Sequence, residues 1–206
     1  MTHYFDPEQT DSLACFASLL ESMLKKHTSF HDLVLLCIGS DRATGDSLGP
    51  LLGHRLQQGR LLEKNGFHLY GTLEHPVHAK NLEATIRHIQ FYHSAPLIIA
   101  LDASLGRQEH IGYVTLRKGP LFPGVGVAKN LPPVGDICIT GIVNFAGCKR
   151  QQLLQTTSLG LVVGLVDFIQ NGLFLSLDSL QLRRQIHGQI LQAVHRQLRP
   201  PLQCAE

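Results

Sequence analysis

Two aspartates, Asp46 and Asp102, are the residues of this sequence best placed to do chemistry. Asp102 directly follows a continuous apolar run at 97–101, and Asp46 lies in the loop after a similar run at 33–38. Such runs are typical of strands buried on both faces, and open α/β sheets bind ligands beyond the carboxyl ends of their strands. Two carboxyl groups brought together there can drive hydrolysis, because the ionised one removes a proton from water while the protonated one polarises a carbonyl. The ordinary alternative is that each aspartate caps a helix or turn.

Two glycine-containing loops accompany these acids. The loop at 39–49 has three glycines, which allow sharp turns, but it matches neither the P-loop nor the dinucleotide-binding pattern. A second cluster contains Gly124 and Gly126, where an extended peptide could approach the backbone. We therefore expect the loop at 119–130 to form one wall of a cleft that also holds Asp46. The alternative is that its glycines only make a tight turn.

Other reaction classes have weaker support in the sequence. His75 and His78 are three residues apart beside Glu74, but the H-E-x-x-H pattern is absent and no third ligand is evident, so no metal ligands are assigned. There is no G-x-S-x-G motif, and Cys37 and Cys138 lie in apolar runs that do not suit an exposed nucleophile. No cofactor is expected, and a divalent metal stays an open alternative.

The elements that must position these residues alternate along the chain. Alternation of strands and helices predicts a three-layer α/β/α sandwich with a mostly parallel, mixed sheet, and we expect a single domain over residues 1–206. The continuous apolar runs at 33–38 and 97–101 are expected to form parallel strands that are adjacent or nearly so and buried on both faces by helices. The segment at 113–117 alternates in polarity, which favours an antiparallel or edge strand. The expected strands are 33–38, 67–71, 97–101, 113–117 and 136–142, and the expected helices are about 12–27, a segment ending at 56, 81–93, 152–170 and about 177–198.

Composition limits the classes of protein to consider. The chain has 206 residues, of which 44% are hydrophobic and 17% charged, as in globular proteins. Its formal net charge of +2 is too small to indicate a binder of nucleic acid or of a membrane surface. The five cysteines form no C-x-x-C pair, which favours a reducing compartment. No signal peptide is evident, and no apolar run reaches the roughly 18 residues of a membrane span. We therefore expect a cytoplasmic protein.

Four motifs, in order, resemble those of the YyaC-type sporulation proteins. They are GSDRATGDSLGP at 39–50, PVHA at 76–79, IIALDA at 98–103 and PGVGV at 123–127. The resemblance runs from about residue 33 to 175. These proteins are similar in turn to the germination protease of endospore-forming bacteria, which degrades small acid-soluble spore proteins. The resemblance implies a phosphorylase/hydrolase-like fold and an atypical aspartic peptidase whose two essential acids fall on Asp46 and Asp102.

The resemblance extends to further site residues and to a metal alternative. The matching motifs imply that the substrate meets Ser40, Asp41, His78, Gly124 and Gly126. The fold also resembles that of hydrogenase-maturation endopeptidases, in which acids at these two positions join a histidine to hold a nickel-type ion. The nearest histidine after Asp102 is His110. The propeptide of the germination protease has no counterpart here, so autoprocessing is not expected.

The resulting functional prediction is a sporulation-associated peptidase with a two-aspartate site. Its expected partner is a protein or peptide substrate, without membrane or direct nucleic-acid binding, and the oligomeric state is left open. Its expected location is the cytoplasm of the forespore or mother cell of an endospore-forming bacterium. Two alternatives remain: a non-catalytic spore protein that binds a protein tail in the same cleft, and a metal-dependent maturation endopeptidase.

Overall fold

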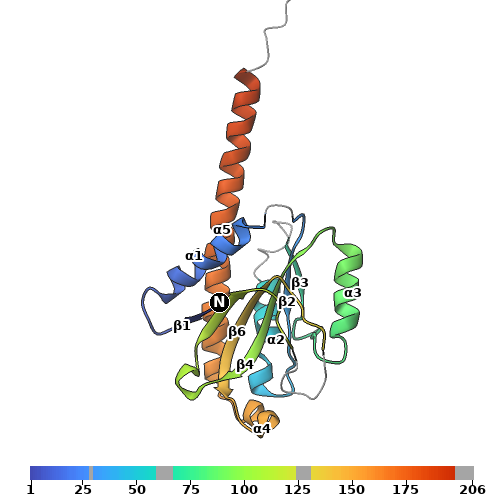
Figure 1. The fold of residues 1–206 in the computed structure, drawn as a ribbon, viewed down its shortest axis with the longest axis vertical. Coiled ribbons are helices and arrows are strands. Elements are labelled where there is room, and N and C mark those ends of the chain that lie inside the picture. The colour runs from blue at the N-terminus through green and yellow to red at the C-terminus, as the bar shows by residue number, and fades with distance from the viewer. Residues whose placement is uncertain (28–29, 59–66, 124–130, 198–206) are drawn as a thin grey trace, which may run out of the picture.

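A six-stranded mixed sheet organises the chain (Figure 1). The structure is a computed structural model that describes residues 1–27, 30–58, 67–123 and 131–197. Side chains are described as far as Asp178, and the backbone alone from there to residue 197. The strand order is β1-β5-β6-β4-β2-β3. In chain order the strands are β1 (Thr2–Phe5), β2 (Leu33–Cys37), β3 (Phe67–Tyr70), β4 (Leu97–Gly106), β5 (Val114–Lys118) and β6 (Ile137–Phe145).

The predicted neighbours β2 and β4 are adjacent and parallel. Leu33 lies opposite Leu97, and Cys37 lies opposite Leu101. Strand β3 extends the parallel set on the other side of β2, and β6 extends it beyond β4. Strands β5 and β1 are antiparallel to their neighbours, so the sheet is mixed as predicted.

Helices cover both faces of this sheet, which confirms the three-layer architecture. Along β2, Leu33, Leu35 and Cys37 belong to the core beneath α1, α2 and α5, whereas the alternate residues of the strand belong to the core beneath α3. Because both faces are apolar, the strand shows no alternation in sequence. The helices are α1 (Ser12–Lys25), α2 (Leu48–Gln58), α3 (Leu82–Tyr92), α4 (Arg150–Gln155) and α5 (Leu159–Gln197), with 3-10 turns η1 (Thr44–Asp46) and η2 (Gln108–His110).

The structure differs from the sequence-based expectation at the sheet edge and in β4. Strand β5 is not at the edge, because β1 pairs with it, and β1 is too short and polar to be recognised in the sequence. Strand β4 does not end before Asp102 but continues to Gly106. Its extension is stabilised by hydrogen bonding to β6 alone, since β2 has already ended opposite Leu101. Asp102 therefore lies one position beyond the last pairing of β4 with β2.

The two C-terminal helices expected at 152–170 and 177–198 are replaced by short α4 and one continuous helix, α5, which extends away from the sheet (Figure 1). The Asn171-Gly172 pair resembles a helix end. Instead, Gly172 lets α5 approach α1, because a Cβ there would lie 2.4 Å from Cδ1 of Phe16.

Part of α5 also corrects the expectation about membrane spans. The stretch Leu159–Asp178 is long and apolar enough to cross a membrane by length and composition, with a mean hydropathy of 1.6. It was missed because polar residues such as Asp167 and Gln170 interrupt the run. Core helices of soluble proteins pass the same test, and Val162, Val166 and Ile169 of this stretch are buried in the core.

Candidate functional site

The chain after β2 folds into a tight loop that turns Asp46 back toward the end of the strand. The Ile38 N–H donates to the Leu101 carbonyl at 2.7 Å, and the Ser40 N–H donates to the Asp46 carbonyl at 3.0 Å. Gly39 makes the turn possible, since its φ is +140° and a Cβ would lie only 2.1 Å from the Asp46 carbonyl oxygen. The loop thus depends on a glycine to place Asp46 beside the extended half of β4.

Polar neighbours favour the ionised form of the Asp46 carboxyl. The Ser40 hydroxyl donates to Oδ2 of Asp46 at 2.8 Å. Burial raises the pKa of Asp46, but the hydrogen bonds from Ser40 and the charge of His78 act in the opposite direction and hold the increase back. Asp46 is therefore the more readily ionised of the two predicted acids.

The environment of Asp102 favours the protonated form. Its Oδ1 accepts one hydrogen bond, from the Ala103 N–H at 2.8 Å. Burial raises the pKa of Asp102 well above the ordinary value of 3.8, and the charge of Asp46 raises it further. The two carboxyl groups therefore lie close enough to interact. Burial raises both pKa values, but that of Asp102 is raised further, so Asp46 is the first of the pair to ionise.

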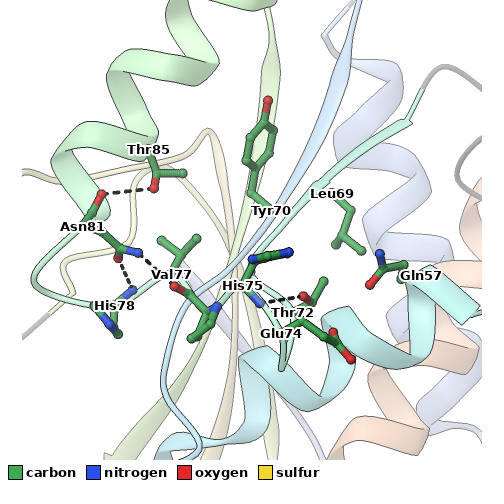
Figure 2. A pocket seen from close by; sticks show the side chains of 12 residues that line it. Gln57, Leu69, Tyr70, Thr72, Glu74, His75, Val77, His78, Asn81 and Thr85 are labelled. Carbon is green, nitrogen blue, oxygen red and sulfur yellow. Dashed lines mark hydrogen bonds between the residues drawn. The ribbon is translucent and has the colours of Figure 1, made fainter.

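His78 joins this pair because its segment runs beside the end of β2. Val77 forms a parallel bridge with Ile38, and the Gly39 N–H donates to the Val77 carbonyl at 2.8 Å. Asn81 then fixes the segment: its Oδ1 accepts from the His78 N–H at 2.8 Å (Figure 2). The sequence predicted a role for His78 but not for Asn81, although Asn81 lies just after the PVHA motif.

A cavity of about 540 Å³ lies beside His78. It is formed by the end of β3, the segment after it and the start of α3 (Figure 2). His78 lines this cavity, whereas Asp46 and Asp102 do not, so the histidine connects the cavity to the acids. The sequence did not indicate other lining residues, namely Gln57, Tyr70, Thr72 and Thr85.

For Asp41, Gly124 and Gly126, contact with the substrate stays a prediction. Asp41 is exposed. Gly124 and Gly126 lie outside the described residues, so the prediction that the loop at 119–130 forms a cleft wall stays a prediction. In its described beginning, Leu121 exchanges two backbone hydrogen bonds with Val134, and both residues belong to the core beneath α3.

Two other residues considered for metal binding, His110 and Glu74, have partners away from the acids. His110 packs instead between Tyr4 and Tyr113, and Glu74 pairs with His54 at 2.9 Å. Within the described ranges, one group of three residues has potential ligand atoms within 4.8 Å of one another, namely Asp32, His68 and His93. The ligand atoms of Asp46, Asp102 and His78 are not that close together.

Both cysteines considered as nucleophiles are buried. Burial raises the pKa of the Cys37 thiol to about 12 and that of the Cys138 thiol to about 11. A thiol is a nucleophile mainly as its thiolate, which these values disfavour. Neither thiol is therefore suited to act as a nucleophile.

The raised pKa of Asp102 predicts a specific pH dependence of stability. The folded chain holds the Asp102 proton to a higher pH than the unfolded chain. The stabilising contribution of this group is therefore complete below about pH 4 and is lost as the pH rises through the folded-state pKa. Asp102→Asn cannot titrate, so the Tm of the variant relative to wild type should increase between about pH 4 and pH 8. Thermal unfolding followed by circular dichroism across this range tests the expectation, and parallel Tm curves would contradict it.

Comparisons with known proteins place the chain in a family. The uncharacterized protein YyaC of Bacillus subtilis is 45% identical over 178 residues, which cover 85% of this chain and 84% of that protein. A solved structure, the [NiFe] hydrogenase maturation protease HycI of Thermococcus kodakarensis, is 16% identical, covers 75% of this chain and 98% of its own, and superposes with a TM-score of 0.45. The family described as protein of unknown function DUF1256 matches residues 2–172. The chain is therefore a member of the DUF1256 family and a relative of YyaC.

Proposed function

We propose that this protein is a cytoplasmic, sporulation-associated peptidase that hydrolyses a protein substrate with Asp46 and Asp102. The observation that carries the proposal is the electrostatic interaction between the two carboxyl groups, whose surroundings push their pKa values apart: burial raises both, but that of Asp102 is raised further, so Asp46 ionises first. Pairs of titratable groups with such opposed environments are a mark of acid–base catalysis. Because the nearby ligand atoms do not converge on a metal position, the proposed reaction uses none.

Each acid takes one role in the proposed reaction. The Asp46 carboxylate removes a proton from water while the water oxygen bonds to the carbonyl carbon of the scissile peptide. Asp102 gives its proton to the carbonyl oxygen, which forms a tetrahedral intermediate. The carbon–nitrogen bond then breaks as Asp46 protonates the leaving amine and Asp102 recovers its proton from the hydroxyl group. The products are a carboxylic acid and an amine, and both acids return to their starting states.

The cavity beside His78 is the proposed position of a substrate side chain or chain end. Its lining combines apolar residues such as Leu69 and Val77 with polar ones such as Asn81, as in sites that bind a ligand in a defined orientation. Its volume of about 540 Å³ suits one or two residues of a peptide rather than a folded domain. This arrangement also fits the alternative of a non-catalytic protein that binds a protein tail, since binding needs the cavity but not the acids.

A search for newly formed chain ends distinguishes a peptidase from a protein that only binds a protein tail. Purified protein is added to an extract of sporulating Bacillus subtilis that lacks YyaC, and the N-termini that appear are identified by mass spectrometry. A peptidase produces new termini that are absent with the Asp46→Asn, Asp102→Asn double variant, and the rate has a bell-shaped pH dependence. No new termini with the wild type, or the same termini with the double variant, would refute the proposal.

A further inference from the structure

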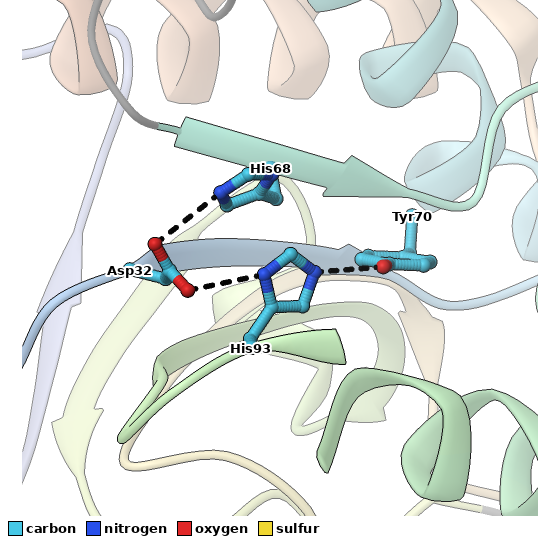
Figure 3. Close-up of polar contacts among 4 residues, drawn as sticks. All are labelled: Asp32, His68, Tyr70 and His93. Atoms are coloured by element: carbon cyan, nitrogen blue, oxygen red, sulfur yellow. Dashed lines mark hydrogen bonds and ion pairs between the residues drawn. The ribbon is translucent and has the colours of Figure 1, made fainter. Parts of the chain in front are cut away.

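Figure 3 shows a second cluster of polar side chains, formed by Asp32, His68, Tyr70 and His93. It lies at the amino ends of β2 and β3, whereas the two acids lie near the carboxyl ends of β2 and its partner β4. Asp32 directly precedes β2, His68 is the second residue of β3, and His93 is the first residue after α3. The register of β2 and β3 places His68 opposite Val34, so that it lies near the start of both strands. Three segments distant in sequence thus bring one carboxylate and two imidazoles together at the amino ends of the parallel strands.

The ligand atoms of this cluster lie near one another, and two of the pairs, each to a different oxygen of Asp32, are at distances found between the ligands of one small ion. Oδ1 of Asp32 lies 3.5 Å from Nε2 of His68, and Oδ2 lies 3.3 Å from Nδ1 of His93. One ligand atom from each residue lies within 4.8 Å of the others. In a tetrahedral zinc site with bonds of about 2.0–2.1 Å, neighbouring ligand atoms are about 3.4 Å apart. Little movement of the side chains is therefore needed to bind an ion.

Tyr70 holds the ring of His93 in place by a hydrogen bond. Its hydroxyl lies 2.8 Å from Nε2 of His93, on the side of the ring away from Asp32 (Figure 3). Metal-binding histidines characteristically hydrogen-bond through the second ring nitrogen, which fixes the ring and leaves the first nitrogen to the ion. The side chain of His93 is only 8% exposed, whereas that of His68 is 40% exposed. One ligand is thus held in place, and the other leaves a path from solvent.

We propose that Asp32, His68 and His93 bind one divalent transition-metal ion of the zinc type, with water completing the coordination. Two nitrogens and one carboxylate oxygen form a ligand set that zinc accepts. The ion joins β2, β3 and the end of α3, which gives it a stabilising role. No step of the proposed peptidase reaction involves the three ligands, although Tyr70 also lines the cavity proposed for the substrate.

Zinc titration of the full-length protein tests the site. After treatment with a chelator and its removal, isothermal titration with ZnCl2 should give one ion per chain. At a free Zn²⁺ concentration about 100 times Kd, the Tm should rise by about 5–10 °C relative to the metal-free protein. Co²⁺ should bind with the visible absorption of a four-coordinate complex. Absence of stoichiometric Zn²⁺ binding, or binding with no change in Tm, would overturn the proposal.

Variants determine where the ion binds. His68→Gln should weaken Zn²⁺ binding by at least about 100-fold, and Tyr70→Phe by about 10-fold because it removes only the support of a ligand. His54→Gln is the matched control, since its ion pair with Glu74 is a histidine–carboxylate pair outside the cluster, and it should bind Zn²⁺ like wild type. His68 is the most exposed ligand, so its replacement is the least disruptive to folding. Unchanged binding in His68→Gln, or loss of binding in Asp46→Asn, would place the ion elsewhere and overturn the proposal.

Discussion

Replacing either Asp46 or Asp102 with asparagine is expected to lower the rate of peptide hydrolysis by about a thousandfold or more. Asparagine keeps the size and one oxygen acceptor of aspartate but can neither accept the proton of water nor supply one to the carbonyl oxygen. Because the two acids act in one cycle, the double variant should be little worse than either single variant. The measurement is kcat/KM on a substrate identified from the extract experiment.

Measurements of thermal stability distinguish a loss of catalysis in these variants from a loss of folding. The Ser40 hydroxyl can still donate to the asparagine oxygen at position 46, and asparagine at position 102 removes a carboxyl whose ionisation burial disfavours. Both variants should therefore unfold at or slightly above the wild-type Tm at neutral pH. Asp11→Asn, an exposed substitution at the start of α1, is the control and should leave rate and Tm unchanged. A single variant that retains more than about a tenth of wild-type activity would rule out the proposed roles.

The second large effect is expected from Gly49→Ala, which should destabilise the fold by about 3 kcal/mol or more. Gly49 lies in the first turn of α2, where a Cβ would be 2.1 Å from the Ile38 carbonyl oxygen. Alanine would push α2 away from the end of β2 and displace the Asp46 loop with it. Urea denaturation of wild type and variant measures the change in the free energy of unfolding.

Gly164→Ala provides a matched control on a second helix. A Cβ at Gly164 in α5 would meet nothing within 4 Å, so the greater helix propensity of alanine should stabilise the protein by about 0.5–1 kcal/mol. Replacement of glycine by alanine is thus expected to lower the free energy of unfolding at Gly49 and to raise it at Gly164. A loss of less than about 1 kcal/mol in Gly49→Ala would show that α2 does not pack as closely on β2 as the structure indicates.

The sequence by itself determined the centre of the sheet and the two acids beside it. Burial on both faces leaves a continuous apolar run, so β2 and β4 could be recognised and predicted to be parallel neighbours. The position of Asp46 after the first run and of Asp102 after the second followed from the same pattern. The antiparallel addition at β5 was also visible in the alternating polarity of its residues, although Thr115 on its polar side is buried.

Only the tertiary structure decided which distant residues meet. The length of β4 depends on hydrogen bonds from β6, and the continuity of α5 past Gly172 depends on contact with Phe16. His78 rather than His110 approaches the acids, because the segment after β3 pairs with the end of β2. The cluster of Asp32, His68 and His93 likewise has no local signal, since strand pairing alone brings together residues up to 61 positions apart. The hydrophobic periodicity of a sequence indicates which residues of one segment are buried. It does not indicate which distant segments contact one another, and the contacts named above form between such segments.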